Sequence, residues 1–273
     1  KNYNVAVEKE LTAVSSPLSK ISLADGQDST YSPTKAKALI ATAKEELEAE
    51  GVSLPIKLDI PEIEKDQTGI NQAKSFKKSI ESVLGKDNVQ VDIQLLSQDK
   101  YLAGTYEATT GAQADYDISN ASGWSPDYED PSSYLDIYNP ESGSMLSTIG
   151  LTIGDAESAA VAKTVGLDKY ATLVDTAEAE TSDVNKRNAL FAKAEAALLD
   201  SGIQIPVYSD GGTPSVTKIV PFTGSYAPSG LGGANSYKYM KLQSKPVTTA
   251  QYNKAKAAWN KERAKIAKAN ADD

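Results

Sequence analysis

The sequence predicts an α/β fold, because a strand, a helix and a second strand follow one another early in the chain. Residues 56–60 alternate apolar and charged side chains, as does a strand with one buried face. Apolar side chains then recur at helical spacing from Ile70 to Leu84, and Gly85 follows as a helix stop. Residues 89–95 alternate again. This order predicts a right-handed βαβ unit.

The remaining elements are predicted from caps, glycine stops and apolar periodicity. Further helices are expected over residues 33–50, 98–106, 155–164, 167–179, 182–201 and 248–269. Further short strands are expected over residues 115–119, 203–208, 216–220 and 236–242. The first strand is expected to end before Pro61, because proline cannot donate a hydrogen bond to a neighbouring strand.

Composition is that of a soluble globular protein. Of the 273 residues, 40% are apolar and 24% are charged, and no apolar run is long enough to span a membrane. The net charge is -9, and the only arginines are Arg187 and Arg263. Nucleic acid is therefore not expected as a partner, because binding phosphates requires clustered basic side chains.

The chain contains neither histidine nor cysteine. This excludes catalysis by a Cys or His nucleophile or base, Ser-His-Asp triads, and zinc sites built from Cys and His. Any catalysis would therefore rest on carboxylates, Lys, Tyr or Ser, and no cofactor is expected. The first residues lack the apolar core of a signal peptide, so either the chain is cytoplasmic or its front has been removed.

The segment 122–131 stands out as a candidate binding site. It contains a tryptophan, a tyrosine, three carboxylates and two prolines in ten residues. The prolines Pro126 and Pro131 fix their own φ and favour extended conformations at the residues before them, so a stiff loop is expected. The predicted strand 115–119 runs directly into this loop. Loops at the carboxyl ends of strands are where α/β sheets bind ligands.

Chemistry alone leaves the roles of these side chains open. Spacing favours turn capping for the carboxylates Asp127, Glu129 and Asp130. The alternatives are calcium binding, although the EF-hand pattern is absent, and an acid/base pair such as a glycosidase uses. Trp124 suits a core position and stacking on a ligand equally well. The glycines at 211–212 and 230–233 are interpreted as turns, because no strand and helix flank them as in phosphate-binding loops.

The loop Gly-Trp-Ser-Pro-Asp-Tyr-Glu-Asp-Pro at 123–131 resembles the signature Gly-Trp-x-x-Asp-Tyr-x-Asp-Pro of the dipeptide/oligopeptide/nickel solute-binding proteins of ABC importers. Residues 31–37, 115–118 and 205–208 resemble this family's helix start, lead-in strand and return crossing. The tail after Lys245 resembles Gram-positive, streptococcal-type lipoproteins. The resemblance spans most of the chain, but family members are roughly twice as long, so it implies a C-terminal portion only.

The resemblance implies a lobe of the type II periplasmic-binding-protein-like fold, with a mixed sheet flanked by helices. Residues 1–204 would form the second, C-terminal lobe, and residues 205–273 would return to complete the first lobe. The implied function is extracellular capture of oligopeptides for an ABC permease, without catalysis. A lipid anchor on the missing N-terminal part would hold the protein at the cell surface. The alternative is an adhesion or peptide-signal-sensing module that uses the same fold without transport.

The resemblance also implies the binding residues. The family's ammonium-binding aspartate corresponds to Asp127, and its flanking tryptophan corresponds to Trp124. The substrate-binding set expected on these grounds is Gly123, Trp124, Ser125, Asp127, Tyr128 and Tyr208. Short peptides would bind through their backbone, as an added β-strand does, and through their free amino terminus.

Overall fold

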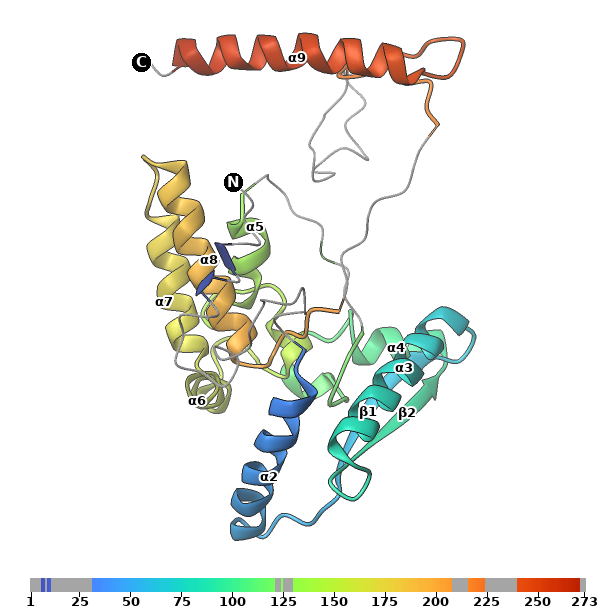
Figure 1. Cartoon of the computed structure of the whole chain (residues 1–273), viewed down its shortest axis with the longest axis vertical. Coiled ribbons are helices and arrows are strands. Elements are labelled where there is room, and N and C mark those ends of the chain that lie inside the picture. The colour runs from blue at the N-terminus through green and yellow to red at the C-terminus, as the bar shows by residue number, and fades with distance from the viewer. Residues whose placement is uncertain are drawn as a thin grey trace. The chain divides into compact units, whose positions relative to one another are not determined.

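The structure is a computed structural model, shown in Figure 1. It describes residues 6–7, 9–10, 31–120, 124, 130–207, 216–223 and 240–270. The chain divides into two compact units, and each is described by itself. The first unit comprises Lys1–Gly123 and Tyr134–Pro206, and the second comprises Trp124–Ser133 and Val207–Asp273.

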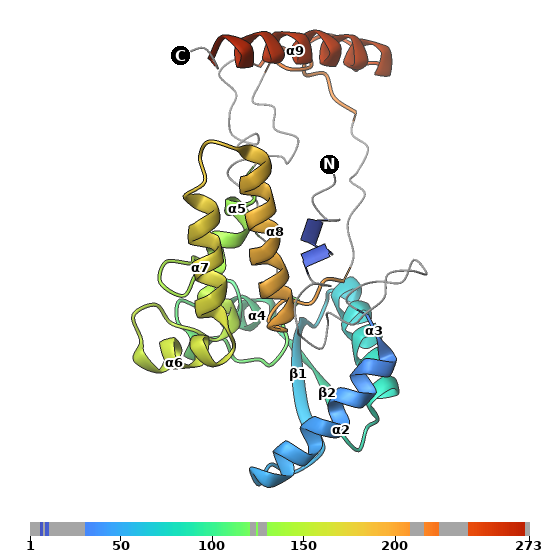
Figure 2. The same cartoon turned by 60° about the vertical axis from the view of Figure 1, so that its left-hand side comes forward.

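The first unit contains the predicted βαβ unit. Strand β1 (Ile56–Ile63) pairs in parallel with β2 (Val89–Leu96), and helix α3 (Gln67–Leu84) connects them. The register aligns Ile56 with Val89 and stays unbroken to the ends of both strands. Figure 2 shows the two strands side by side. The predicted order of strand, helix and strand is confirmed.

Strand β1 continues through Pro61, so the expectation that it ends before this proline is wrong. The amides of Ile56 and Glu64 donate to the β2 side, to the carbonyls of Asn88 and Leu96. Because residues along a strand alternate in the edge to which their amides point, Pro61 faces the edge that β2 does not occupy. A proline on this edge removes no hydrogen bond from the sheet.

The core of the βαβ unit lies between the strands and α3. Its fully buried members are Ile60, Ala73 and Val91, and side chains of both strands and α3 pack around them. Glu81 of α3 also contacts β2, because its carboxylate accepts a hydrogen bond of 3.1 Å from the Val91 amide. This hydrogen bond, together with the ammonium groups of Lys77 and Lys86, lowers the pKa of Glu81.

Helices make up most of the rest of the first unit. The α-helices are α2 (Pro33–Ala49), α4 (Gln98–Gly104), α5 (Ser132–Leu135), α6 (Ala156–Thr164), α7 (Leu167–Glu178) and α8 (Val184–Asp200). Short 3-10 helices are η2 (Gly111–Gln113), η3 (Asp136–Tyr138) and η4 (Leu146–Ile149). The predicted helices in these regions are confirmed, with ends that differ by a few residues.

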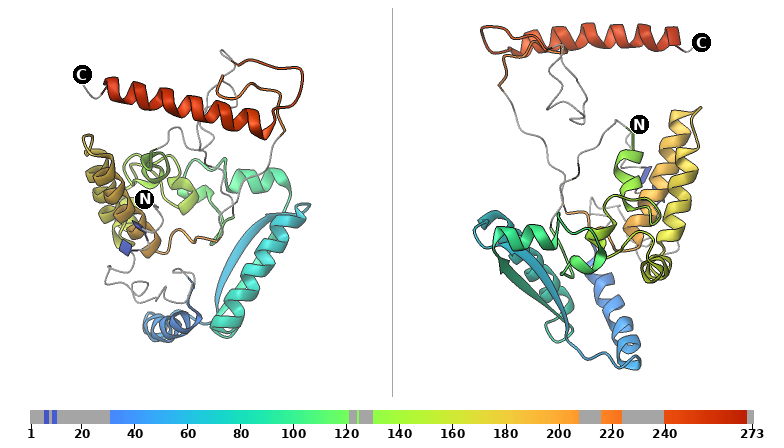
Figure 3. Two further views of the ribbon diagram at one scale, coloured as in Figure 1. Left: turned by 45° about the horizontal axis from the view of Figure 1, so that its top comes forward. Right: turned by 180° about the vertical axis from the view of Figure 1, so that it is seen from behind.

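A helical hairpin of α7 and α8 forms the largest core of this unit, and Figure 3 shows the two helices side by side. Tyr170 of α7 and Phe191 of α8 are at most 1% exposed and belong to this core. The Arg187 guanidinium of α8 holds the end of α7 and the loop after it, because its Nη1 donates to the carbonyls of Ala177, Glu178 and Glu180 at 2.8–3.2 Å. The hairpin is therefore fixed at its tip as well as in its core.

The second unit contains the C-terminal helix α9 (Thr249–Asn270), which confirms the helix predicted there. The ring of Phe222 stacks on Trp259 of α9 with 5.1 Å between ring centroids. The predicted strands at 216–220 and 236–242 are wrong in their described parts, because only one antiparallel bridge forms, between Ile219 and Leu242. Residues 236–239 lie outside the described part of the chain.

The strand predicted at 203–208 is also wrong over its described residues. Residues 203–207 form no strand, and Ile205 and Val207 are 53% and 72% exposed. An apolar run becomes a strand only when another strand pairs with it, and none does so here.

Within the described ranges, no helix combines the length and apolar character that crossing a bilayer requires.

Candidate functional site

The segment that leads into the candidate loop lies along β1. The Ile118 amide donates to the Asp59 carbonyl at 3.0 Å. Asp59 and Asp117 also exchange hydrogen bonds, because the amide of each donates to the carboxylate of the other at 2.9 and 3.0 Å. Asp59 belongs to the free edge of β1, by the same alternation that places Pro61 there. The predicted strand 115–119 is therefore wrong, since side chains supply most of this contact and no ladder forms.

Two further features define the lead-in segment. The hydroxyl of Tyr116 donates to the Thr148 carbonyl at 2.6 Å, which fixes the segment on its other side. The pKa of Asp59 is raised, first because the carboxyl is partly buried and then because Asp117 adjoins it. The entrance to the loop is consequently anchored at three successive residues, Tyr116, Asp117 and Ile118.

The candidate loop itself is described only in part. Trp124 is half-buried, and its indole Nε1 donates to the Ser133 carbonyl at 2.5 Å. This bond commits the only polar group of the indole, so the ring offers a ligand its faces and edges and no hydrogen-bond donor. Ring orientation is fixed by the same bond.

Asp130 shapes the turn that follows. Its Oδ1 accepts from the Ser132 amide at 3.0 Å, and its carbonyl accepts from the Ser133 amide at 3.1 Å. A carboxylate that accepts from an amide two residues later is an Asx turn, which starts α5 here. The prediction that Asp130 serves as a cap is confirmed.

The other predicted binding residues lie outside the described part of the chain. These are Gly123, Ser125, Asp127, Tyr128 and Tyr208. Glu129, which was expected to cap a turn, lies outside it as well. Of the six predicted binding residues, the structure thus places Trp124, and the others stay predictions.

After the loop in sequence, Leu135 of α5 belongs to the core of the first unit. Leu135 is 5% exposed, and the hydroxyl of the buried Tyr170 donates to its carbonyl. Three residues further on, η3 supplies Tyr138, whose hydroxyl accepts from Gln204 Nε2 at 2.6 Å. Burial raises the pKa of Tyr138, so it stays a neutral phenol at physiological pH. Sequence periodicity gave no signal for either contact, because both join residues far apart in the chain.

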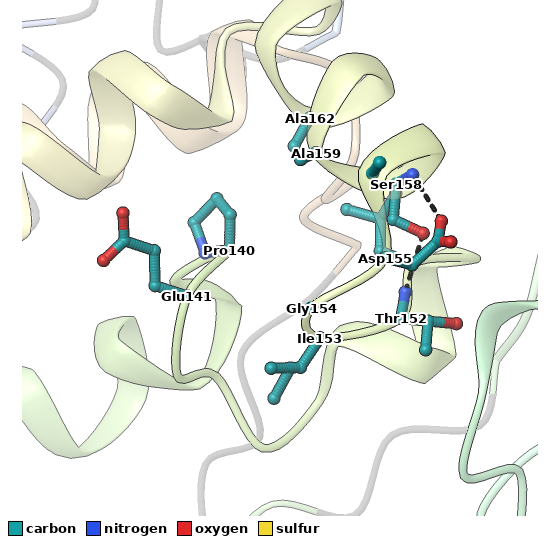
Figure 4. A pocket seen from close by; sticks show the side chains of 11 residues that line it. Pro140, Glu141, Thr152, Ile153, Gly154, Asp155, Ser158, Ala159 and Ala162 are labelled. Carbon is teal, nitrogen blue, oxygen red and sulfur yellow. Dashed lines mark hydrogen bonds between the residues drawn. The ribbon is translucent and has the colours of Figure 1, made fainter.

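An open pocket of about 350 Å³ lies in the first unit between α6 and the loops before it, as Figure 4 shows. Two of its polar groups are engaged in local structure: Asp155 Oδ2 accepts from the Ser158 amide at 2.7 Å, and Ser158 Oγ accepts from the Thr152 amide at 3.0 Å. The bond from the Ser158 amide caps α6 and lowers the pKa of Asp155. Trp124, the one predicted binding residue that the structure describes, does not line this pocket.

Across the residues that the structure describes, no three acidic side chains gather closely enough to hold a metal ion. The arrangement of the described residues is that of a fixed aromatic ring beside an acidic turn. No protein-family model matches the chain.

A solved structure of a peptide-binding protein shares this fold. The chain is similar to the pheromone receptor PrgZ, in a structure described by its mode of peptide binding, with a TM-score of 0.50 and 17% sequence identity. The similarity covers 78% of this chain and 35% of PrgZ. At this identity the likeness concerns the fold, and it confirms the predicted class, a type II periplasmic-binding-protein-like α/β fold.

Sequence comparison identifies closer relatives. The chain is 46% identical over 263 residues to the oligopeptide-binding protein AliB of Streptococcus pneumoniae serotype 4 (strain ATCC BAA-334 / TIGR4), covering 96% of this chain and 40% of AliB. It is 45% identical to the oligopeptide-binding protein SarA of Streptococcus gordonii, covering 97% of this chain and 40% of SarA. The chain is a homologue of the streptococcal oligopeptide-binding proteins and spans about 40% of their length. The resemblance found in the sequence is confirmed.

Proposed function

We propose that this chain takes part in the extracellular capture of oligopeptides for an ABC importer. The observation that carries the proposal is its identity of 43–46% to streptococcal oligopeptide-binding proteins over 96–97% of its own length. These relatives are named as binding proteins, and we propose that this chain likewise binds peptide without transforming it. The comparisons do not favour the alternative of an adhesion or signal-sensing module.

The proposed partners follow from this role. Short peptides are the ligands, and the permease of the importer receives them. In the proposed arrangement, residues 1–204 form most of one lobe and residues 205–273 return to a second lobe. A lipid anchor elsewhere in a longer protein would hold both at the cell surface.

Within the site, Asp127 is proposed to accept the ammonium group at the peptide's amino terminus. A charge-assisted hydrogen bond of this kind is roughly twice as strong as a neutral one, and it gains weight in an enclosed site. The loop supplies three carboxylates and no basic side chain, so its charge suits a cation. Asp130 is committed to the Ser132 amide, which makes it less suited to a ligand than Asp127.

Trp124 is proposed to stack on the peptide beside that ammonium group. Its Nε1 is already bonded to the Ser133 carbonyl, so the ring is oriented before any ligand arrives. A side chain that is fixed in advance loses little conformational entropy on binding. Gly123, Ser125, Tyr128 and Tyr208 are proposed to contact the peptide backbone, which is sequence-tolerant because every peptide has the same main chain.

Calorimetric titration tests the ammonium role. The probe is a pentapeptide of alanine and lysine with a free amino terminus, and the same peptide with an acetylated amino terminus is the comparison. In the longer protein that carries this chain, Asp127→Ala should weaken binding of the free peptide by roughly tenfold or more, in line with the loss of a charged hydrogen bond. Acetylation should have the same effect on the unmodified protein.

A matched variant, Glu129→Gln, removes another carboxylate from the same loop and should leave the affinity within about twofold, because Glu129 is predicted to cap the turn and not to contact the peptide. Equal binding of the free and acetylated peptides would contradict the role of Asp127. Binding of neither peptide, nor of a mixture of peptides from two to eight residues, would contradict peptide capture itself.

A further inference from the structure

The C-terminal helix α9 differs in charge from the rest of the chain. Between Thr249 and Asn270 it carries five lysines and Arg263 against a single acidic residue, Glu262, whereas the whole chain has a net charge of -9. Helix α9 is thus a local concentration of net positive charge in a chain that is acidic overall. A concentration of this kind acts on partners of opposite charge.

Four of the lysines lie along one face of α9. They are separated by seven, four and three residues, so at 3.6 residues per turn they fall within about 60° of one another. They are Lys254, Lys261, Lys265 and Lys268, and all are exposed. From first to last, the lysine line measures about 21 Å at 1.5 Å per residue. Figure 1 shows α9 as one unbroken helix, so the line is straight.

The opposite face of α9 holds the helix on its own unit. Tyr252 and Trp259 lie on this face, and both rings contact Phe222, with centroids 5.6 and 5.1 Å apart. Arg263 lies over the Trp259 ring at 4.6 Å, which adds a cation–π contact to the same face. The rings therefore fix the rotation of the helix, and the lysine line points away from this packing.

An ordinary solvated helix face mixes charges of both signs, since Glu and Lys pairs then support the helix. The lysine line contains no acidic side chain, and Glu262 lies outside it by the helical period. Like charges on adjacent turns repel, so the line lowers the stability of the helix slightly. This pattern points to an anionic partner with a flat, extended surface.

We propose that the lysine line of α9 docks on the anionic phospholipid headgroups of a membrane. A bilayer presents phosphates over a plane, so all four lysines of a straight line meet them at once. The proposal rests on the proposed function, in which the protein works beside a membrane permease. The aromatic face is occupied by Phe222, so contact is electrostatic, without insertion of the helix into the acyl chains.

Vesicle sedimentation tests the proposal. The probes are vesicles of phosphatidylcholine with on the order of 30% phosphatidylglycerol, and vesicles of phosphatidylcholine alone. The protein should bind the anionic vesicles at about 50 mM salt and be released at about 0.5 M salt, where exposed charges are screened. The protein should not bind vesicles of phosphatidylcholine alone.

Two variants with the same loss of charge separate the lysine line from net charge. The first replaces the four lysines of the line by glutamine, which keeps helix propensity. The second makes the same change at four exposed lysines of the first unit: Lys74, Lys78, Lys100 and Lys163. The first variant should lose roughly tenfold or more in vesicle affinity, and the second should stay within about twofold. Circular dichroism checks that both remain helical.

Equal losses in the two variants, or no binding to anionic vesicles by the unmodified protein, would overturn the proposal. Stronger binding to soluble polyglycerol phosphate than to vesicles would also overturn it, because the partner would then be a polymer. Peptide affinity is measured in parallel. A lysine-line variant that no longer binds vesicles but still binds peptide supports docking. If the unmodified protein binds anionic vesicles but no peptide, the proposed function is contradicted and the docking is not.

Discussion

Replacing Tyr170 by phenylalanine should destabilise the first unit by removing one buried hydrogen bond. The Tyr170 ring is 1% exposed, and its hydroxyl donates to the carbonyl of Leu135, which is itself 5% exposed. Phenylalanine keeps the ring and its packing, so the change removes only the oxygen. The Leu135 carbonyl then has neither this donor nor free access to water. Leaving a buried carbonyl unpaired costs about 1–3 kcal/mol.

The loss is measurable as a shift in the unfolding midpoint. For a domain of this size, each 1 kcal/mol lowers the melting temperature by about 2–4 °C, so a decrease of about 3–10 °C is expected. Urea unfolding followed by circular dichroism gives the free energy directly. Tyr106→Phe is the matched control because Tyr106 is 46% exposed, and its change should stay within about 0.5 kcal/mol.

Alkaline pH supplies a second measurement. Burial raises the pKa of Tyr170 far above the 10.0 of a free tyrosine. The folded state therefore holds the proton more tightly, so the stabilisation is complete below pH 10.0 and is lost as the pH rises toward the folded pKa. Tyr170→Phe should remove this part of the alkaline dependence. Equal destabilisation by Tyr170→Phe and Tyr106→Phe, or none by the former, would refute the reasoning.

Four further variants test the first unit. Gly111→Ala should destabilise by about 2 kcal/mol or more, because the new Cβ would lie 2.1 Å from the Gly150 carbonyl oxygen. Gly104→Ala meets nothing within 4 Å and, in chemical unfolding, should be neutral or stabilising by up to about 1 kcal/mol. Burial raises the pKa of Glu62, whose Oε1 has no partner. The folded state therefore holds the Glu62 proton more tightly than the unfolded state, so the unmodified protein should gain stability over Glu62→Gln as the pH falls from 7 toward 4.5. An opposite slope in urea titrations would contradict this. Lys186 and nearby hydroxyl and amide groups lower the pKa of Glu180 to about 2. The contribution of Glu180 to the stability of the folded state should therefore be complete above pH 4.5 and disappear toward pH 2. A Glu180→Gln difference that persists in thermal melts at pH 2 would rule this out.

Helices were predictable because their signals are local. Ser32 and Pro33 mark the start of α2, and the Ser32 side chain does accept from an amide of the first turn. The start of α3 was placed at Ile70, three residues late, although Asp66 carries a readable cap. Its Oδ1 accepts from the amides of Thr68 and Gly69 at 2.9 and 3.2 Å. The Asp66 cap is a local signal for this start, and apolar spacing alone does not contain it.

Strands were less predictable because each depends on a partner elsewhere in the chain. Residues 56–63 and 89–96 pair with each other, and alternation found both. The segments at 115–119 and 203–207 also alternate between polar and apolar side chains over most of their length, yet neither forms a ladder. The first is held instead by the exchange between Asp59 and Asp117, which local periodicity does not reveal. Pairing is a nonlocal property, and the sequence pattern gives only the capacity for it.

The structure tests the predicted chemistry of the candidate site at two residues, Asp130 and Trp124. Spacing favoured caps for all three carboxylates, and Asp130 does cap. For Trp124, spacing left core packing and ligand stacking tied. The structure adds the bond from its Nε1 to the Ser133 carbonyl, a contact that depends on the path of the loop. The role of Asp127 came from the resemblance alone, since no pattern of spacing separates it from Glu129.

The two proposed interactions have opposite charge and should respond differently to salt. The loop at 122–131 carries three carboxylates and no base, whereas the lysine line of α9 carries four lysines and no acid. The four lysines are exposed, so mobile ions screen them with a Debye length of about 10 Å at 0.1 M. An ammonium group enclosed beside Asp127 would be screened much less, because ions do not enter a closed site. A salt series from about 50 mM to about 0.5 M should therefore release anionic vesicles while peptide affinity changes little. Parallel losses of both would mean that the peptide contact is as exposed as the lysine line, which would contradict an enclosed site for the amino terminus.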